Sequence, residues 1–195
     1  MKRALFLLGA VALVVVLVIG LTQAGGKEEP GKSQSDFDLA KAKQQLAGAP
    51  APLAALHDQA DELLEGGPDA FQKRLRELRG HPVVINKWAS WCGPCRAELP
   101  ILQRISTERG KEIAFVGVNA RDKRPAAERF IANYPAPYPS YEDPDETIAR
   151  ELKAPSNFPV TLFLDGKGKT VFTHQGGYRD ASELTADIDK YLSGP

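Results

Sequence analysis

The only two cysteines of this 195-residue chain lie close together, in the stretch KWASWCGPC that runs from Lys87 to Cys95. The apolar run VVINKWA, residues 83–89, directly precedes them and is short and continuous, as expected for a buried central strand. Apolar residues at helical spacing then predict a helix from Gly93 to about Gly110. The cysteine pair is therefore predicted at a strand-to-helix junction, and this junction constrains the fold more than any other feature.

The rest of this region predicts alternating strands and helices. In chain order, we expect a buried strand over 112–120, a helix opened by Pro125, a rigid Pro- and Tyr-rich loop over 134–144, a short helix over 145–153, a strand hairpin over 159–176 and a terminal helix over 181–192. This order indicates an α/β domain with a mixed central sheet flanked by helices.

The N-terminus has the pattern of a membrane-targeting segment. Lys2 and Arg3 precede an uncharged apolar run of eighteen residues. A cleaved signal has an apolar core of about 7–15 residues, and a spanning helix needs about 17–25. We therefore expect a retained signal-anchor over residues 1–24, with cleavage near residues 22–24 as the alternative. The basic residues favour a single-pass orientation in the cell membrane, with the following domain outside the cytoplasm, where disulfides are permitted.

Two segments connect this anchor to the α/β domain. Residues 25–36 combine Gly, Ser, Pro and charge without apolar periodicity, which predicts a flexible linker. Residues 37–79 carry leucines at helical spacing between glycine and proline stops, which predicts a helical extension. The domain itself is expected over residues 80–195.

Four kinds of chemistry are compatible with a closely spaced cysteine pair. A structural disulfide with such a short loop would contribute only about 2 kcal/mol in the chain-entropy model. A zinc site needs four ligands, and none of the three histidines lies in a paired spacing. Haem attachment needs a histidine directly after the second cysteine, where Arg96 stands. The fourth is a dithiol that cycles between thiol and disulfide.

The predicted position of the pair favours the redox dithiol. Cys92 would lie at a helix N-terminus, where free N–H groups and the helix dipole stabilise a thiolate, with its side chain exposed to a partner. Cys95 would lie one turn further along the same helix face, within reach of the first sulfur. Gly93 and Pro94 suit the tight helix entry. Cys92 would then attack a substrate disulfide, and Cys95 would resolve the mixed disulfide.

The string WCGPC is the active-site motif of thioredoxins, and VVINKWASWCGPCRAELP resembles the membrane-anchored TlpA/ResA-like branch of that superfamily. The resemblance extends from about Arg79 to the C-terminus, with FPVTLFLDGKGKTV as a second matching stretch. It implies a thioredoxin-like fold and a thiol:disulfide interchange activity that needs no cofactor or metal beyond the Cys92–Cys95 disulfide.

The resemblance also implies further site residues. Pro159 matches a cis-proline that exposes the backbone of Phe158 to a substrate peptide; the alternative is a trans proline opening an edge strand. Trp91, Gly93 and Pro94 would form the substrate-facing surface around Cys92.

Two residues of the resemblance concern proton transfer. Glu98 matches a glutamate implicated in tuning the thiol pKa and would assist deprotonation of Cys95; the alternative is an exposed helix carboxylate. Asn86 stands where cytosolic thioredoxins carry a proton-accepting aspartate, and an amide can only form hydrogen bonds. We interpret Trp88 as core, and His174 and Gln175 as surface residues.

We therefore expect a monomeric, membrane-anchored oxidoreductase that reduces disulfides of proteins outside the cytoplasm. The family suggests apocytochromes or copper-site assembly proteins as clients and a membrane thiol carrier as electron donor. A disulfide-forming oxidase and a copper-handling or chaperone module are the alternatives. With 25 basic and 25 acidic residues, the net charge gives no electrostatic argument for nucleic acid.

Overall fold

The computed structural model describes residues 35–192, which belong to one compact unit. The predicted anchor over 1–24 and residues 25–34 of the predicted linker lie outside this range. Among residues 35–192, no helix has the length and apolar character needed to span a membrane.

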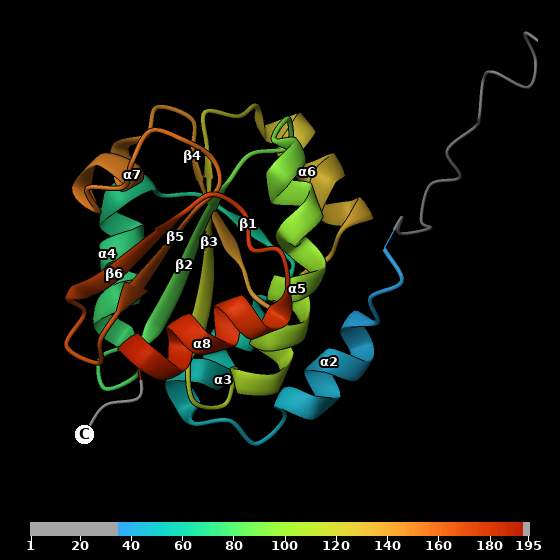
Figure 1. Cartoon of the computed structure of the whole chain (residues 1–195), viewed down its shortest axis with the longest axis vertical. Helices are drawn as coiled ribbons and strands as arrows, with labels where there is room; N and C mark the ends of the chain where they lie inside the picture. Colours follow the sequence, from blue (N-terminus) through green and yellow to red (C-terminus); the bar gives the residue numbers. More distant parts are fainter. Residues whose placement is uncertain (1–34, 193–195) are drawn as a thin grey trace, which may run out of the picture. The chain divides into compact units, whose positions relative to one another are not determined.

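A six-stranded mixed sheet forms the centre of the fold (Figure 1), with the strand order β1-β4-β3-β2-β5-β6. The four strands from β1 to β2 are parallel, and β5 and β6 are antiparallel to their neighbours. The strands are β1 Leu63–Leu64, β2 Val83–Trp88, β3 Ala114–Ala120, β4 Ser140–Asp143, β5 Val160–Leu164 and β6 Thr170–Gln175. The predicted mixed sheet and the predicted hairpin are confirmed.

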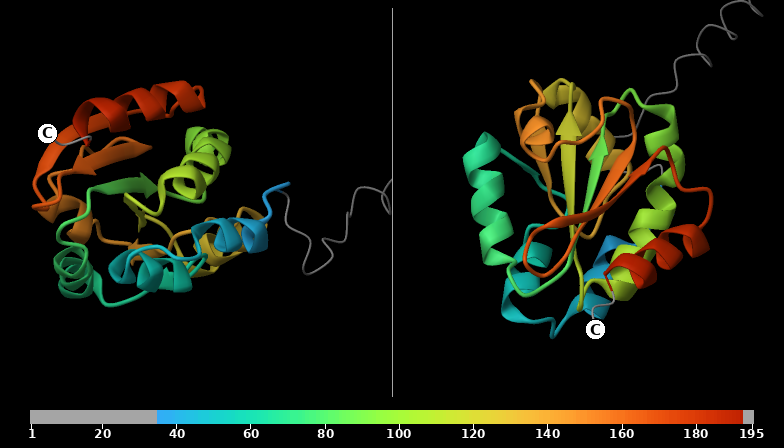
Figure 2. Two further views of the ribbon diagram at one scale, coloured as in Figure 1. Left: turned by 90° about the horizontal axis from the view of Figure 1, so that it is seen from below. Right: turned by 60° about the vertical axis from the view of Figure 1, so that its left-hand side comes forward.

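Helices cover both faces of this sheet (Figure 2). They are α2 Leu39–Leu46, α3 Ala51–Asp58, α4 Gly67–Glu77, α5 Gly93–Arg109, α6 Arg124–Asn133, α7 Thr147–Glu151 and α8 Ala181–Tyr191. Apolar side chains of α4 and α7 pack with Val83 and Ile85 on one face of β2. Those of α5 and α8 pack with Val84 on the opposite face. Successive residues of β2 thus alternate between two helix layers, as strand geometry requires.

Two predictions about the elements are wrong. The helical interpretation of 37–79 fails at Leu63–Leu64, which form β1 beside β4. Helix α3 ends at Asp58 because the chain turns at Asp61, whose φ is +69°. Since α4 covers the sheet and β1 is one of its strands, the predicted boundary at residue 80 corresponds to no break in the fold. The predicted loop over 134–144 contains β4, whose four residues are too few to show a strand pattern in the sequence.

Candidate active site

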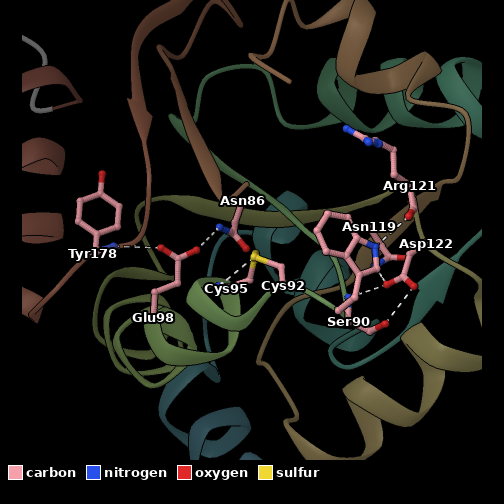
Figure 3. Close-up of a disulfide and its surroundings, with 10 residues drawn as sticks. Asn86, Ser90, Cys92, Cys95, Glu98, Asn119, Arg121, Asp122 and Tyr178 are labelled. Atoms are coloured by element: carbon pink, nitrogen blue, oxygen red, sulfur yellow. Dashed lines mark hydrogen bonds between the residues drawn. A yellow bond between two sulfur atoms is a disulfide. The ribbon is translucent and has the colours of Figure 1, made fainter. Parts of the chain in front are cut away.

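The cysteine pair lies where the sequence predicts it, at the junction of β2 and α5 (Figure 3). Cys92 is the N-cap of α5, and Cys95 lies in the first turn, with Pro94 between them. The two sulfurs form a disulfide across a Cα–Cα distance of 5.3 Å. The Cys92 sulfur also accepts the backbone N–H of Cys95 at 3.1 Å. The same N–H would face a Cys92 thiolate, where it and the helix dipole favour the charged form.

The expected exposure of the Cys92 side chain is not found. Cys92 is 4% exposed and Cys95 is 3% exposed. The disulfide holds the Cys92 sulfur against Cys95, and both residues belong to an apolar cluster with Trp88 and Phe130. Access to the pair therefore depends on the surrounding rim.

Trp91 forms the outer part of that rim and is 56% exposed. Its indole N–H donates to the carbonyl of Arg121 at 3.0 Å, and its ring packs on the ring of Phe158 at a centroid distance of 5.0 Å and an interplanar angle of 63°. The bond between Phe158 and Pro159 is cis, as predicted. Gly93 and Pro94 are exposed beside Trp91. In contrast, Trp88 is buried and donates to the Ser140 hydroxyl, so its prediction as core is confirmed.

A buried lysine below this rim has no counterpart in the sequence predictions. Lys87 on β2 is 1% exposed. Its ammonium donates to the carbonyl of Pro155 at 2.5 Å, lies 3.4 Å from a carboxylate oxygen of Glu146, and lies 4.1 Å from the ring centroid of Phe158. Burial lowers the pKa of Lys87, and the Glu146 carboxylate opposes that shift. Lys87 thus connects β2 to the loop that carries Phe158.

A half-buried aspartate, Asp122, fixes the chain just before Cys92. The Asp122 carboxylate accepts the backbone N–H of Ser90 at 2.5 Å and the Ser90 hydroxyl at 2.9 Å. It also accepts the side-chain amide of Asn119 at 3.0 Å. These bonds join the loop after β3 to the segment that presents Trp91 and Cys92 (Figure 3). The sequence offered no signal for this role, because the partners lie about thirty positions apart along the chain.

Glu98 lies one turn beyond Cys95 and is completely buried, with 0% exposure. The alternative of an exposed helix carboxylate is therefore wrong, and the role of Glu98 in tuning the thiol pKa stays a prediction. One carboxylate oxygen accepts the amide of Asn86 at 2.8 Å, and the other accepts the backbone N–H of Tyr178 at 3.1 Å. Burial raises the pKa of Glu98 to about 7, and these two hydrogen bonds oppose part of that shift. Asn86 acts as a hydrogen-bond donor, as an amide at this position must.

A small cavity lies on the inner side of Cys95. Its lining includes Cys95, Asn86 and Asp61, and its volume is about 20 Å³, enough for one water molecule. Burial raises the pKa of Asp61 to about 6. Asp61, a carboxyl group whose proton affinity is raised by burial, thus borders the same space as Cys95. The sequence interpretation assigned Asp61 to a helix and missed this placement.

His174, interpreted from the sequence as a surface residue, is partly exposed and makes two side-chain contacts. Its side chain is 26% exposed, its ring stacks on Tyr178, and its Nδ1 lies 3.4 Å from a carboxylate oxygen of Asp187. Gln175 is exposed, as predicted. Within residues 35–192, no group of three or more His, Cys, Asp and Glu side chains is arranged to hold a metal ion.

Comparisons with known proteins agree with this geometry. A family model described as Redoxin matches residues 46–188. The chain is 32% identical to the thiol:disulfide interchange protein DsbE of Yersinia pestis, over 93% of this chain and 89% of that protein. It is 25% identical to the thiol-disulfide oxidoreductase ResA of Bacillus subtilis, over 87% of this chain and 84% of that protein.

Solved structures extend the likeness to the fold. A DsbE-type thiol:disulfide interchange protein from Chlorobium tepidum superposes with a TM-score of 0.54 and is 30% identical. The match covers 58% of this chain and 82% of that one. The predicted thioredoxin-like α/β fold is confirmed, as is the predicted similarity to ResA-like proteins.

Proposed function

The chain belongs to the Redoxin family and is a thiol:disulfide oxidoreductase of the DsbE and ResA type; we propose that it works as a reductase of protein disulfides outside the cytoplasm. The observation that carries the chemistry is the Cys92–Cys95 disulfide at the N-terminus of α5. The direction of electron flow is supported by the Gly93-Pro94 spacer, which the chain shares with thioredoxins.

In the reducing direction, the Cys92 thiolate attacks one sulfur of a client disulfide. A mixed disulfide forms between Cys92 and the client, and the other client sulfur leaves as a thiolate. Cys95 then loses its proton and attacks the Cys92 sulfur. The Cys92–Cys95 disulfide forms, the second client thiolate leaves, and two electrons have passed from the cysteine pair to the client. A dithiol donor, a membrane thiol carrier in this proposal, reduces the pair again.

Glu98 is the proposed acceptor of the Cys95 proton. It lies three residues after Cys95, on the same side of α5, and Asn86 contacts the Glu98 carboxylate and borders the Cys95 cavity. A carboxyl group with a pKa of about 7 is well matched to take and return a proton near neutral pH. Because Asn86 cannot accept a proton, Glu98 would act as the proton acceptor in place of the residue at position 86.

The client would bind at the rim. Trp91 and Phe158 provide an aromatic surface beside the pair, and the backbone of Phe158 and Pro159 would pair with an extended client segment. The uncharged run at residues 4–21 supports a single membrane anchor, and residues 25–36 would act as the tether. We propose that the protein is a monomer in the membrane.

An equilibrium redox titration of the Cys92–Cys95 pair tests the direction. A potential near that of thioredoxin, about −270 mV, is expected for a reductase. A potential near about −120 mV, as in strong oxidants, would instead assign the chain to disulfide formation. The chemistry itself is tested by Cys92→Ser, which should abolish disulfide exchange, since full activity in that variant would contradict any role of Cys92 as nucleophile.

A further inference from the structure

One of the two hydrogen bonds on the Glu98 carboxylate comes from a distant backbone group. The N–H of Tyr178, in the loop between β6 and α8, donates to Glu98 Oε2 at 3.1 Å (Figure 3). This loop packs closely on the site. A Cβ placed on Gly177 would lie 3.4 Å from the carbonyl oxygen of Pro94 and 3.8 Å from the ring of Pro159. The loop therefore contacts both the entrance of α5 and the cis-proline.

The backbone of this loop does not by itself fix the position of Tyr178. Two glycines precede it, and Gly176 has a φ of +97°, a conformation that reflects the freedom of glycine. The backbone N–H of Gly176 donates to the carbonyl of Pro159 at 3.0 Å, which holds the start of the loop. Beyond the two glycines, contacts of the Tyr178 side chain help to set the position of its N–H.

Those contacts form a compact cluster of three side chains. The Tyr178 hydroxyl donates to Asp187 Oδ2 on α8 at 2.8 Å. Its ring stacks on His174 of β6, with centroids 4.0 Å apart and an interplanar angle of 17°. His174 Nδ1 lies 3.4 Å from the same Asp187 oxygen. Tyr178 is 4% exposed, so the side chain is held from its ring face and from its hydroxyl.

We propose that Asp187 and His174 are positioning residues for Glu98: they hold Tyr178 in the place where its N–H donates to the Glu98 carboxylate. The proposal deepens the proposed function, since it matters for disulfide exchange only if Glu98 takes the proton of Cys95. The carboxylate of Asp187 thus acts on the site through one side chain and one backbone N–H, without touching a cysteine.

Few other groups influence the protonation of Glu98. Asn86 from β2 is neutral. Burial and, to a smaller extent, the charge of Glu98 raise the pKa of buried Tyr138, before β4. On the β6–α8 side, Tyr178 donates to Glu98, Asp187 and His174 contact Tyr178, and the charge of Glu183 also acts on Tyr178. Glu98 makes no ion pair within the part of the chain that the structure describes. With neutral donors alone, each hydrogen bond to the charged form weighs heavily on the protonation equilibrium.

The sign of the effect follows directly. A hydrogen bond to a carboxylate favours the charged form and lowers its pKa. The Tyr178 N–H lowers the pKa of Glu98 against the larger effect of burial. Loosening Tyr178 should therefore raise the pH at which Glu98 titrates by about 0.5 to 1 unit. This value is the pKa shift that two or three N–H donors cause in a carboxylate, divided by the number of donors.

The test compares Tyr178→Phe and Asp187→Ala with the control Glu183→Gln, all in the full chain. Tyr178→Phe removes only the hydroxyl contact and preserves the packing. Asp187→Ala removes the partner of both Tyr178 and His174. Glu183 lies one turn earlier on α8 and accepts the N–H of Arg179, the residue next to Tyr178. The Glu183→Gln substitution therefore perturbs the same helix and the neighbouring residue, and it removes none of the contacts among Tyr178, His174 and Asp187.

The readout is the side-chain carboxyl resonance of Glu98 in a ¹³C NMR titration of the reduced protein, assigned by its loss in Glu98→Gln. We expect the midpoint to move upward in Tyr178→Phe, further in Asp187→Ala, and not in Glu183→Gln. An unchanged midpoint in Asp187→Ala, or an equal shift in Glu183→Gln, overturns the proposal.

The pH profile of alkylation of the reduced cysteine pair, measured on the same variants, separates this inference from the proposed function. If the Glu98 midpoint and the alkylation profile move together, the positioning role of Asp187 and His174 and the role of Glu98 as proton acceptor are both supported. If the midpoint moves and the alkylation profile does not, the positioning role is supported and the assignment of Glu98 as proton acceptor is contradicted.

Discussion

Two buried ionisable side chains lie on opposite sides of β2, and they are stabilised in different ways. Lys87 faces the α4 and α7 layer, and Glu98 meets Asn86 on the α5 layer. Lys87 has a carboxylate partner in Glu146, a carbonyl acceptor in Pro155 and the ring of Phe158. Glu98 has two neutral donors and no counter-charge among residues 35–192.

Burial favours the neutral form of both groups, lowering the pKa of Lys87 and raising that of Glu98 to about 7. The two groups differ in whether a counter-charge opposes this effect of burial. With Glu146 beside it, Lys87 can remain an ammonium group that ties loops together below the rim. Without such a partner, Glu98 is left to titrate near neutral pH. Among residues 35–192, the rim beside Cys92 thus contains a buried cation with a counter-charge, and the region one turn beyond Cys95 contains a buried carboxyl group without one.

The largest expected effect comes from removing the paired charge. Lys87→Ala leaves Glu146 and the Pro155 carbonyl without their buried partner, and we expect a loss of about 3 kcal/mol or more in the free energy of unfolding. Urea denaturation measures it. Arg104→Ala is the control, because Arg104 forms a pair with Glu108 in which the side chains are 66% and 49% exposed, and such pairs contribute about 0–1 kcal/mol. Equal losses in the two variants would show that burial of Lys87 does not matter.

Removing the unpaired charge should change the pH dependence of stability. The pKa of Glu98 rises from 4.5 in the unfolded chain to about 7 in the folded protein. The folded state therefore holds its proton more tightly, and stability falls as pH rises from about 4.5 to about 7, by roughly 3 kcal/mol. We expect Glu98→Gln to lack this loss of stability, because a glutamine side chain does not titrate.

Urea denaturation of wild type and Glu98→Gln at several pH values measures this difference. The variant should gain on the wild type as pH rises through that window and then stay level above about pH 7. Glu77→Gln on α4, with a partly exposed side chain, is the control and should follow the wild type. A difference between Glu98→Gln and wild type that does not depend on pH would mean that folding leaves the pKa of Glu98 unchanged.

The two buried groups also show how far the sequence could predict the site. The strand, the cysteine pair and the helix were predictable because hydrophobic periodicity and the Cys-Gly-Pro-Cys spacing are local signals. The hairpin over residues 159–176 and the cis bond before Pro159 followed from a glycine turn and a family motif. These features depend on residues close together in the chain.

The remaining parts of the site depend on contacts between distant segments. Nothing around Lys87 shows that Glu146 and Phe158 will meet it, since they lie 59 and 71 positions away. The donor from Tyr178 is a backbone N–H, a group that every residue except proline carries, so no residue type reveals it. Leu63–Leu64 followed a helical pattern, and pairing with β4 overrode it. The charge state of Glu98 could not be predicted before its burial was known.

A smaller effect should follow from changing the aromatic partner of Lys87. Phe158→Leu removes the ring that the Lys87 ammonium and the ring of Trp91 contact, at a cost of about 1 kcal/mol beyond the lost apolar area. The unfolding free energies of this variant and of Phe37→Leu separate the two contributions, because half-buried Phe37 makes no ring or cation contact in residues 35–192. Equal losses in both variants would remove Phe158 from the set of groups that stabilise Lys87.

The smallest effect is expected at the exposed cation on the far side of Glu146. Arg121 Nε lies 3.9 Å from Glu146 Oε2, and its side chain is 52% exposed. Water already solvates this guanidinium, so Arg121→Gln should change the free energy of unfolding by less than about 0.5 kcal/mol. The carbonyl of Arg121 that accepts the Trp91 N–H belongs to the backbone and is retained. Urea denaturation could instead show that Arg121→Gln lowers the free energy of unfolding as much as Lys87→Ala does. The exposed and the buried cation beside Glu146 would then contribute equally, and burial could not be the reason that Lys87 stabilises the rim.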